Sequence, residues 1–326
     1  MGTHPVDWSG IRVRILPIEA LGDLTIYLQL AWRFYEQGAD VEFFSNALKP
    51  AEGHFPWLRV CTFNGEDVTQ LAGSCDLLFA NYERSAIHAV WTEAHASLEN
   101  VALVSSKRVP AGVGAAVVNV GGVSFEGASR AFCTNSDAGL TLVDWVNQYV
   151  EVVFGLPRTQ TTPEVYVSRV QDSSRILIFP TTPEPRKNYW LRGFRWLAYR
   201  LVKRGWEVEF VCLPKEVDNL QAALPGQRVR SCQDIGSLLR LVATARIVVS
   251  NDSGGGHLAS LLGLRTFTIT RRGEGFVWRP GFNGSNMVLK PLFRMKLFGR
   301  YIWRPWVPVW RIPRLVGHVN TCQTKN

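Results

Sequence analysis

The sequence lacks any apolar run of the roughly 18 residues that a membrane-spanning helix needs. Its first residues lack the basic region, apolar core and small-residue cleavage site of a secretion signal, which predicts a cytoplasmic protein. The 6 cysteines form no CxxC pair and have no histidine cluster nearby, so a zinc site is disfavoured and reduced thiols are expected.

Several signature motifs of enzymes are also missing. The chain has no GxxxxGK[ST] motif, which excludes a P-loop nucleotidase, and no GxSxG elbow. The absence of GxGxxG after the first expected strand disfavours a dinucleotide oxidoreductase, and no DxD-like pair of carboxylates is ready for a divalent ion. What remains is a chain of 326 residues, 46% hydrophobic and 19% charged, which suits a globular protein with two cores.

Strand and helix patterns alternate in each half of the chain. The first half predicts strands at 11–16, 41–44, 58–62, 76–80 and 101–105 and helices at 23–37 and 138–154, with 111–123 unassigned. After a linker at 155–174, the second half predicts strands at 175–179 and 207–211, a helix at 189–203 and a strand–helix pair within 228–245. This alternation predicts an α/β fold with two Rossmann-like domains, 1–160 and 161–326, that face each other across a cleft.

The segment 246–269 reads as a buried strand, a glycine-rich turn, a short helix and another strand. At such a corner, free backbone N–H groups and the helix dipole favour an anion. Asp252 or Ser253 could simply cap the helix, but three consecutive glycines exceed what a turn needs. We therefore favour phosphate binding by Asp252, Ser253, Gly254 and Gly255. His257 fits a phosphate donor and a packing residue equally well.

The loop 180–187 follows the first strand of the second half and carries two hydroxyls and two cations. Thr181 and Thr182 could donate hydrogen bonds to a diphosphate, with Arg186 and Lys187 supplying positive charge. A solvated loop is the simpler reading for any single residue. The interpretation gains weight because the glycine corner is predicted at the same edge of the same sheet.

In the first half, Asp23 is expected at the start of a helix. It could be an N-cap, or a carboxylate that takes a proton from a hydroxyl nucleophile, and the two roles are compatible. Glu19 on the preceding loop is a second, weaker candidate base.

The net charge of +9 is uneven, because 290–314 carries seven cations, no acidic residue and interleaved aromatic residues. This composition suits an anionic membrane surface, and a nucleic-acid groove could share it. Alternatively, the segment packs its aromatic residues across another domain, since Pro305, Pro308 and Pro313 interrupt a long amphipathic helix. Packing and membrane contact both remain open.

Three places in order resemble the heptosyltransferase family, glycosyltransferase family nine, which has the GT-B architecture. They are Leu21-Gly22-Asp23 before a helix, Arg186-Lys187 followed by Trp190, and Ser250-Asn251-Asp252-Ser253-Gly254 with His257-Leu258-Ala259, preceded by Gln233 and a leucine-rich helix. Together they span nearly the whole chain. The chain departs from the family at Gly255-Gly256, where Pro-Met is usual, and at 271–280, where a short glycine-proline loop is expected.

The resemblance implies inverting, metal-independent transfer of a sugar, heptose or another, from a nucleotide-diphosphate donor, with no further cofactor. It implies that Asp23 is the general base and that Lys187 and Asp252–Gly254 hold the donor. It further implies a bacterial glycolipid or saccharide acceptor, such as lipopolysaccharide core, and a peripheral place at the inner face of the inner membrane, with no nucleic-acid partner.

Other functions fit the same sequence less well. A nucleotide-sugar epimerase or hydrolase of the same architecture would consume donor without an acceptor. A non-catalytic partner in polysaccharide assembly would bind no nucleoside diphosphate. Nucleic-acid binding would show a steep dependence on salt.

Overall fold

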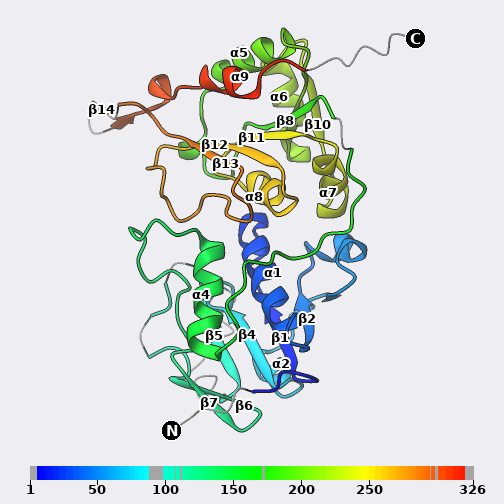
Figure 1. Ribbon diagram of the computed structural model, residues 1–326, viewed down its shortest axis with the longest axis vertical. Coiled ribbons are helices and arrows are strands. Elements are labelled where there is room, and N and C mark those ends of the chain that lie inside the picture. Colours follow the sequence, from blue (N-terminus) through cyan, green and yellow to red (C-terminus); the bar gives the residue numbers. More distant parts are fainter. Residues whose placement is uncertain are drawn as a thin grey trace. The chain divides into compact units, whose positions relative to one another are not determined.

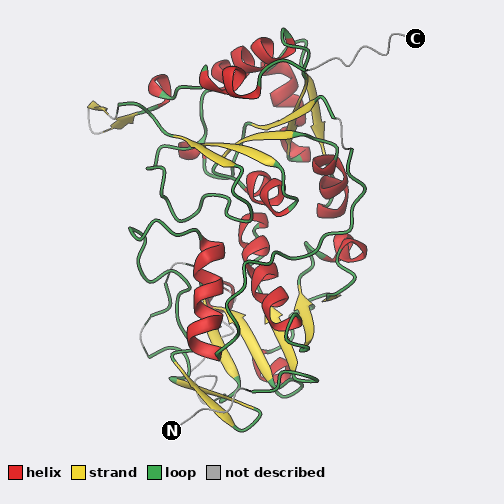
Figure 2. Ribbon diagram, viewed as in Figure 1, coloured by secondary structure: helices red, strands yellow, loops and turns green. Residues whose placement is uncertain are grey.

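The computed structural model describes residues 6–87, 98–106, 108–110, 112–170, 173–293, 295–297 and 300–319. The chain divides into two compact units, Met1–Tyr166 and Val167–Asn326, where the sequence places the boundary at 160/161. Each unit contains its own parallel sheet with helices against it (Figures 1 and 2).

The first unit is built on five parallel strands in the order β3-β2-β1-β4-β5. These strands are β1 (Arg12–Leu16), β2 (Asp40–Phe44), β3 (Arg59–Cys61), β4 (Leu77–Asn81) and β5 (Val101–Val104). The helices are α1 (Leu21–Tyr35), the 3-10 helix η1 (Lys49–His54), α2 (Val68–Ala72), α3 (Tyr82–Ile87) and α4 (Leu142–Phe154). The unassigned segment 111–123 contributes to a separate hairpin, β6 (Val117–Val120) and β7 (Val123–Glu126).

Helix α1 starts two residues earlier than the sequence predicts. The Leu24 N–H donates to the Ala20 carbonyl at 2.9 Å and closes the first turn, so Ala20 occupies the N-cap position. Asp23 is therefore the third helical residue, and the N-cap interpretation of Asp23 is wrong. Its carboxylate still lies in the first turn, where the helix dipole favours negative charge.

The second unit is built on six parallel strands in the order β10-β9-β8-β11-β12-β13. The strands are β8 (Arg175–Phe179), β9 (Glu207–Cys212), β10 (Arg228–Ser231), β11 (Ile247–Asn251), β12 (Arg265–Ile269) and β13 (Asn286–Leu289). The helical segments are η3 (Pro185–Lys187), α5 (Leu191–Val202), η4 (Pro214–Glu216), α6 (Val217–Ala223), α7 (Ile235–Ala243), α8 (Gly254–Leu261), η5 (Arg304–Trp306) and α9 (Arg311–Val316), with a hairpin β14 (Met295–Leu297) and β15 (Arg300–Ile302). The strand order reverses between β8 and β11, and such a reversal is where doubly wound sheets bind ligands.

The basic aromatic segment 290–314 packs within its own unit. Trp303, Val307 and Ile312 are buried in the same hydrophobic core as β8 and α5. The expectation that this segment packs across another domain is therefore wrong for these side chains, since their apolar surface is removed from water inside the second unit. Phe293, Trp306 and Trp310 stay exposed. Within the described residues, no helix has the length and apolar character needed to cross a membrane.

Candidate active site

The loops that follow β8 and β11 meet at the carboxyl edge of the second sheet. Asn251, the last residue of β11, is fully buried and connects the two loops. Its Nδ2 donates to the Pro180 carbonyl at 2.6 Å, and its Oδ1 accepts from the Tyr189 N–H at 2.9 Å. The structure thus brings together the two segments that the sequence predicts at one edge.

A lysine and an aspartate form an ion pair across these loops. Lys187 Nζ lies 3.5 Å from Asp252 Oδ2 and 3.7 Å from Glu184 Oε2. The Lys187 side chain is 30% exposed and that of Asp252 only 9%. Lys187 therefore presents a half-buried cation to solvent, where a ligand could reach it. Arg186 is exposed on the same short helix, η3.

The two threonines of the first loop differ in their contacts. Thr182 is buried, and its hydroxyl contacts the Glu184 carbonyl at 2.8 Å and Asn188 Oδ1 at 2.7 Å, so it shapes the loop. The Thr181 hydroxyl donates to Glu216 Oε2 at 3.0 Å. Glu216 follows β9 at the same edge, and the sequence reasoning missed it. The signal was available, because a carboxylate shortly after a buried strand lies at the edge where ligands bind.

The hydroxyl of Ser253 is unpaired at the start of α8. Ser253 takes the N-cap position, but its side chain forms no capping hydrogen bond. Its Oγ is buried and, among the described residues, has no hydrogen-bond partner. Buried polar atoms normally find a partner, so this hydroxyl is suited to a ligand at the helix N-terminus.

Gly255 and Gly256, the last two glycines of the run, are needed for close packing of α8. A Cβ on Gly255 would lie 2.6 Å from the Phe179 ring, and one on Gly256 would lie 2.6 Å from Ser250 Oγ. Both positions are buried inside the unit. The glycine run therefore has a packing explanation at these two positions, and the direct contact with donor predicted for Gly255 stays a prediction.

We predict that Gly255→Ala destabilises the second unit. The added methyl meets the Phe179 ring closer than real Cβ contacts allow, so overpacking should cost about 1–3 kcal/mol of the free energy of unfolding. Urea unfolding followed by tryptophan fluorescence measures this change. Gly284→Ala is the matched control, since nothing lies within 4 Å of its Cβ. Equal stability of the two variants would contradict the packing role.

His257 is buried in the first turns of α8. Burial lowers the pKa of its imidazole, against the opposing effects of the Asp252 charge and a hydrogen bond with the Trp278 backbone, and Lys187 lowers it further. The ring is therefore neutral at pH 7. Its Nδ1 has no hydrogen-bond partner among the described residues. The structure thus leaves one ring nitrogen of His257 available beside the Lys187–Asp252 pair.

In the first unit, Asp23 contacts a serine from the segment that follows the edge strand β5. Ser106 follows β5 and is buried, and its hydroxyl donates to Asp23 Oδ1 at 2.9 Å. A donor to a carboxylate stabilises its charged form and fixes its orientation. The sequence reasoning missed Ser106, although a polar residue shortly after a buried apolar strand is a recognisable signal.

We predict that Ser106→Ala makes the Asp23 carboxylate a weaker catalyst at low pH, although Asp23 itself is retained. Loss of the donated hydrogen bond destabilises the carboxylate, so the acid limb of the pH profile of kcat/KM should move to higher pH. A merely structural role would lower the melting temperature and leave the profile in place. Ser106→Thr keeps a hydroxyl and should restore the original profile.

Glu19, the weaker candidate base, is fully engaged within its own unit. Its carboxylate accepts from Ser45 Oγ at 2.7 Å and from the N–H groups of Asn46 and Ala47 at 3.1 Å. It also pairs with buried Arg84 at 3.2 Å. These contacts hold the loops at the carboxyl edge of the first sheet, so Glu19 has a structural role and Asp23 is the stronger candidate.

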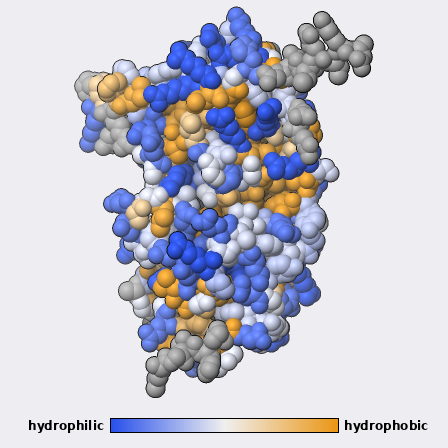
Figure 3. Space-filling model, viewed as in Figure 1, coloured by the Kyte–Doolittle hydropathy of each residue, from blue (hydrophilic) through white to orange (hydrophobic). Residues whose placement is uncertain are grey.

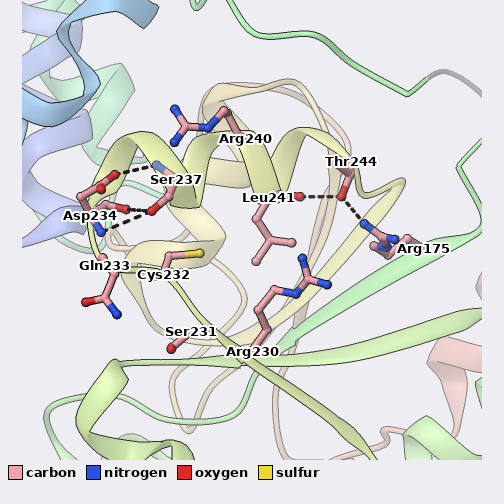
Figure 4. A pocket seen from close by; sticks show the side chains of 10 residues that line it. All are labelled: Arg175, Arg230, Ser231, Cys232, Gln233, Asp234, Ser237, Arg240, Leu241 and Thr244. Atoms are coloured by element: carbon pink, nitrogen blue, oxygen red, sulfur yellow. Dashed lines mark hydrogen bonds between the residues drawn. The ribbon is translucent and has the colours of Figure 1, made fainter.

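A separate pocket of about 480 Å³ lies between β10 and α7 (Figure 4). Its lining includes three arginines, Arg175, Arg230 and Arg240. The first two arginines lie within 4 Å of the buried carboxylate of Glu209. Gln233, which also lines this pocket, follows β10 in the chain, so one end of the pocket lies at the carboxyl edge of the sheet. Within the described part of the chain, no group of three or more His, Cys, Asp or Glu residues could hold a metal ion.

The fold matches solved glycosyltransferases over nearly its whole length. A glycosyltransferase family 9 protein from Veillonella parvula is 13% identical with a TM-score of 0.63, covering 88% of this chain and 87% of that chain. ADP-heptose lipopolysaccharide heptosyltransferase II from E. coli is 14% identical with a TM-score of 0.66, covering 94% and 97%. E. coli heptosyltransferase WaaC with ADP is 12% identical with a TM-score of 0.62, covering 94% and 99%. A search among curated proteins finds no match.

Two parallel sheets of this order define an α/β protein of the GT-B class, which confirms the predicted fold class. Residues 141–282 match the model of glycosyltransferase family 9 (heptosyltransferase). This segment, less than half of the chain, is similar to that family, and the whole chain shares the fold of the solved glycosyltransferases named above.

Proposed function

We propose that the enzyme transfers a sugar, with inversion and without a metal ion, from a nucleoside diphosphate donor to a hydroxyl acceptor. The observation that carries this proposal is the carboxyl edge of the second sheet. There a half-buried cation, a helix N-terminus and an unpartnered hydroxyl converge at the switch point. This combination suits a diphosphate better than a neutral ligand.

On the donor side, negative charge builds on the diphosphate as it leaves. Lys187 exchanges part of its contact with Asp252 for a phosphate oxygen, and the Ser253 hydroxyl donates a hydrogen bond. The N–H groups at the start of α8 complete a set of preorganised dipoles. Arg186 and Thr181 lie at the margin of this site. Glu216 there accepts a hydrogen bond from a hydroxyl of the nucleotide sugar.

On the acceptor side, Asp23 acts as the general base. Its carboxylate takes the proton of the acceptor hydroxyl while that oxygen attacks the anomeric carbon of the donor sugar. The bond from this carbon to the diphosphate oxygen breaks, and the nucleoside diphosphate leaves with the bonding electrons. Attack from the face opposite the leaving group inverts the anomeric centre. Ser106 orients the carboxylate for this step.

The donor and acceptor are inferred from the relatives. Solved structures of the E. coli heptosyltransferase WaaC carry ADP or ADP-2-deoxy-2-fluoro heptose. We therefore propose ADP-heptose as the first donor to test and a glycolipid such as lipopolysaccharide core as the acceptor, at the inner face of the inner membrane. The unusual segment 271–280 contacts the site through Trp278 beside His257, so it is placed to select another sugar.

A screen of nucleotide sugars by thermal shift identifies the donor, because a ligand that binds only the folded state raises the melting temperature. We then expect product only when donor and acceptor are both present, with chelator added. Release of nucleotide or formation of an epimer without acceptor would replace the proposal by a hydrolase or epimerase. Failure to bind any nucleoside diphosphate would favour a non-catalytic role.

A further inference from the structure

Helices α5 and α9 of the second unit lie side by side and belong to segments free of acidic residues. Residues 187–206 and 275–326 contain no Asp or Glu. The first includes α5 and the second includes α9, and these two helices pack against each other (Figure 1). The chain beyond α9 is joined to α5, because the Val319 N–H donates to the Arg204 carbonyl at 3.1 Å. Neither α5 nor α9 therefore supplies a carboxylate to pair with the cations of these helices.

Helix α5 exposes aromatic and aliphatic side chains among its cations. Phe194, Leu197, Ala198 and Leu201 are buried, so the helix already has a complete inward face. Its outward face nevertheless carries Trp196 at 42% exposure and Tyr199 and Val202 at 53%. The exposed cations of the same helix and its end are Arg192, Arg195, Arg200 and Lys203. A solvated helix face does not need these apolar groups, and clustered exposed apolar surface usually marks an interaction site.

The cations and rings of α5 are arranged in pairs. The Arg200 guanidinium lies 5.7 Å from the Trp196 ring centroid, and Lys203 Nζ lies 4.5 Å from that of Tyr199. Each pair places a positive charge beside an amphipathic ring. This is the arrangement that suits a headgroup layer, where rings lie at the interface and cations meet lipid phosphates.

Helix α9 and the preceding segment extend the same surface. Trp310 and Leu315 are exposed at the two ends of α9, with Arg311 and Arg314 exposed between them. In Figure 3, hydrophilic and hydrophobic groups lie side by side over the upper part of the view, where Figure 1 places α5 and α9. Some aromatic side chains of 290–314 are therefore buried in the core, and others are exposed on the surface.

We propose that this α5–α9 face, defined by Arg195, Trp196, Tyr199, Arg200, Val202, Lys203, Trp310, Arg311, Arg314 and Leu315, binds an anionic phospholipid bilayer. Charge complementarity selects a negatively charged partner. The aliphatic Val202 and Leu315 favour the acyl boundary of a bilayer over stacking on nucleic-acid bases. The proposal goes beyond the transfer reaction, since the face contains none of the residues assigned to donor or acceptor.

Co-sedimentation of the whole chain with vesicles tests the proposal. We expect binding to phosphatidylcholine vesicles that contain phosphatidylglycerol and little binding to phosphatidylcholine alone. The double variant Arg200→Gln, Lys203→Gln should weaken vesicle binding about 30-fold, because each cation near an anionic membrane surface strengthens binding about fivefold. Trp196→Ser with Tyr199→Ser should also weaken it, by about tenfold or more.

Matched controls come from the first unit. Arg59→Gln and Tyr166→Ser remove an exposed cation and an exposed ring and should leave vesicle binding unchanged. The α5 variants should keep the melting temperature and donor affinity of the unaltered enzyme, which separates this proposal from the catalytic one. Equal binding of α5 and control variants would overturn it. So would preferential binding of single-stranded nucleic acid, or loss of exposure of this face through self-association.

Discussion

Replacing Asp23 with alanine is expected to lower kcat by about 10²- to 10⁴-fold, the usual contribution of a general base. The affinity for the donor should stay unchanged, because the proposed diphosphate site consists of residues of the second unit. Single-turnover transfer, with donor binding measured by calorimetry, separates the two quantities. The same split would not follow from a folding defect, which would lower both.

Asp218→Ala is the matched control for the Asp23 variant, since Asp218 is an exposed aspartate in the first turn of α6. Its kcat should equal that of the unaltered enzyme. Normal turnover by Asp23→Ala would mean that another group deprotonates the acceptor. Glu19 could not easily replace it, because its carboxylate is occupied by Ser45, two backbone N–H groups and Arg84.

Replacing Lys187 with alanine should weaken binding of the nucleoside diphosphate by about 10- to 100-fold. A hydrogen bond to a charged group contributes about 1.5–3 kcal/mol, and each 1.4 kcal/mol is a tenfold change in affinity. The unpaired Asp252 carboxylate left in the site repels the diphosphate and acts in the same direction. Calorimetric titration with ADP, and with other nucleoside diphosphates, measures the loss.

Lys203→Ala provides the comparison for Lys187, because Lys203 is an exposed lysine of the same unit at the end of α5. In the absence of vesicles it should bind nucleotide as the unaltered enzyme does. If Lys187→Ala and Lys203→Ala had the same affinity, Lys187 would have no role in holding the diphosphate.

The features that local pattern determines were predictable from the sequence. Alternating apolar strands and amphipathic helices predicted both parallel sheets, and strand β8 was predicted with its observed bounds at 175–179. The meeting of the loops after β8 and β11 was also predictable, because parallel strands place their carboxyl ends at one edge. Asn251, at the end of a buried strand, then connects these loops.

The features that depend on distant contacts could not be predicted. Ser106 reaches Asp23 across 83 positions of the chain, and although its place after a buried strand is a local signal, no local pattern says that its partner is Asp23. Gly255 reads as part of a phosphate loop until the ring of Phe179 is known to lie against it. The burial of Trp303 likewise depends on a core formed by β8, α5 and α9, which composition does not reveal.

A crystal structure of the protein with a bound nucleoside diphosphate is the most direct test of the proposed donor site. We predict diphosphate oxygens within hydrogen-bonding distance of Lys187 Nζ and the first N–H groups of α8, with Ser253 Oγ as a further donor. A diphosphate bound instead in the arginine pocket between β10 and α7, or at any other place away from Lys187 and the start of α8, would contradict this prediction.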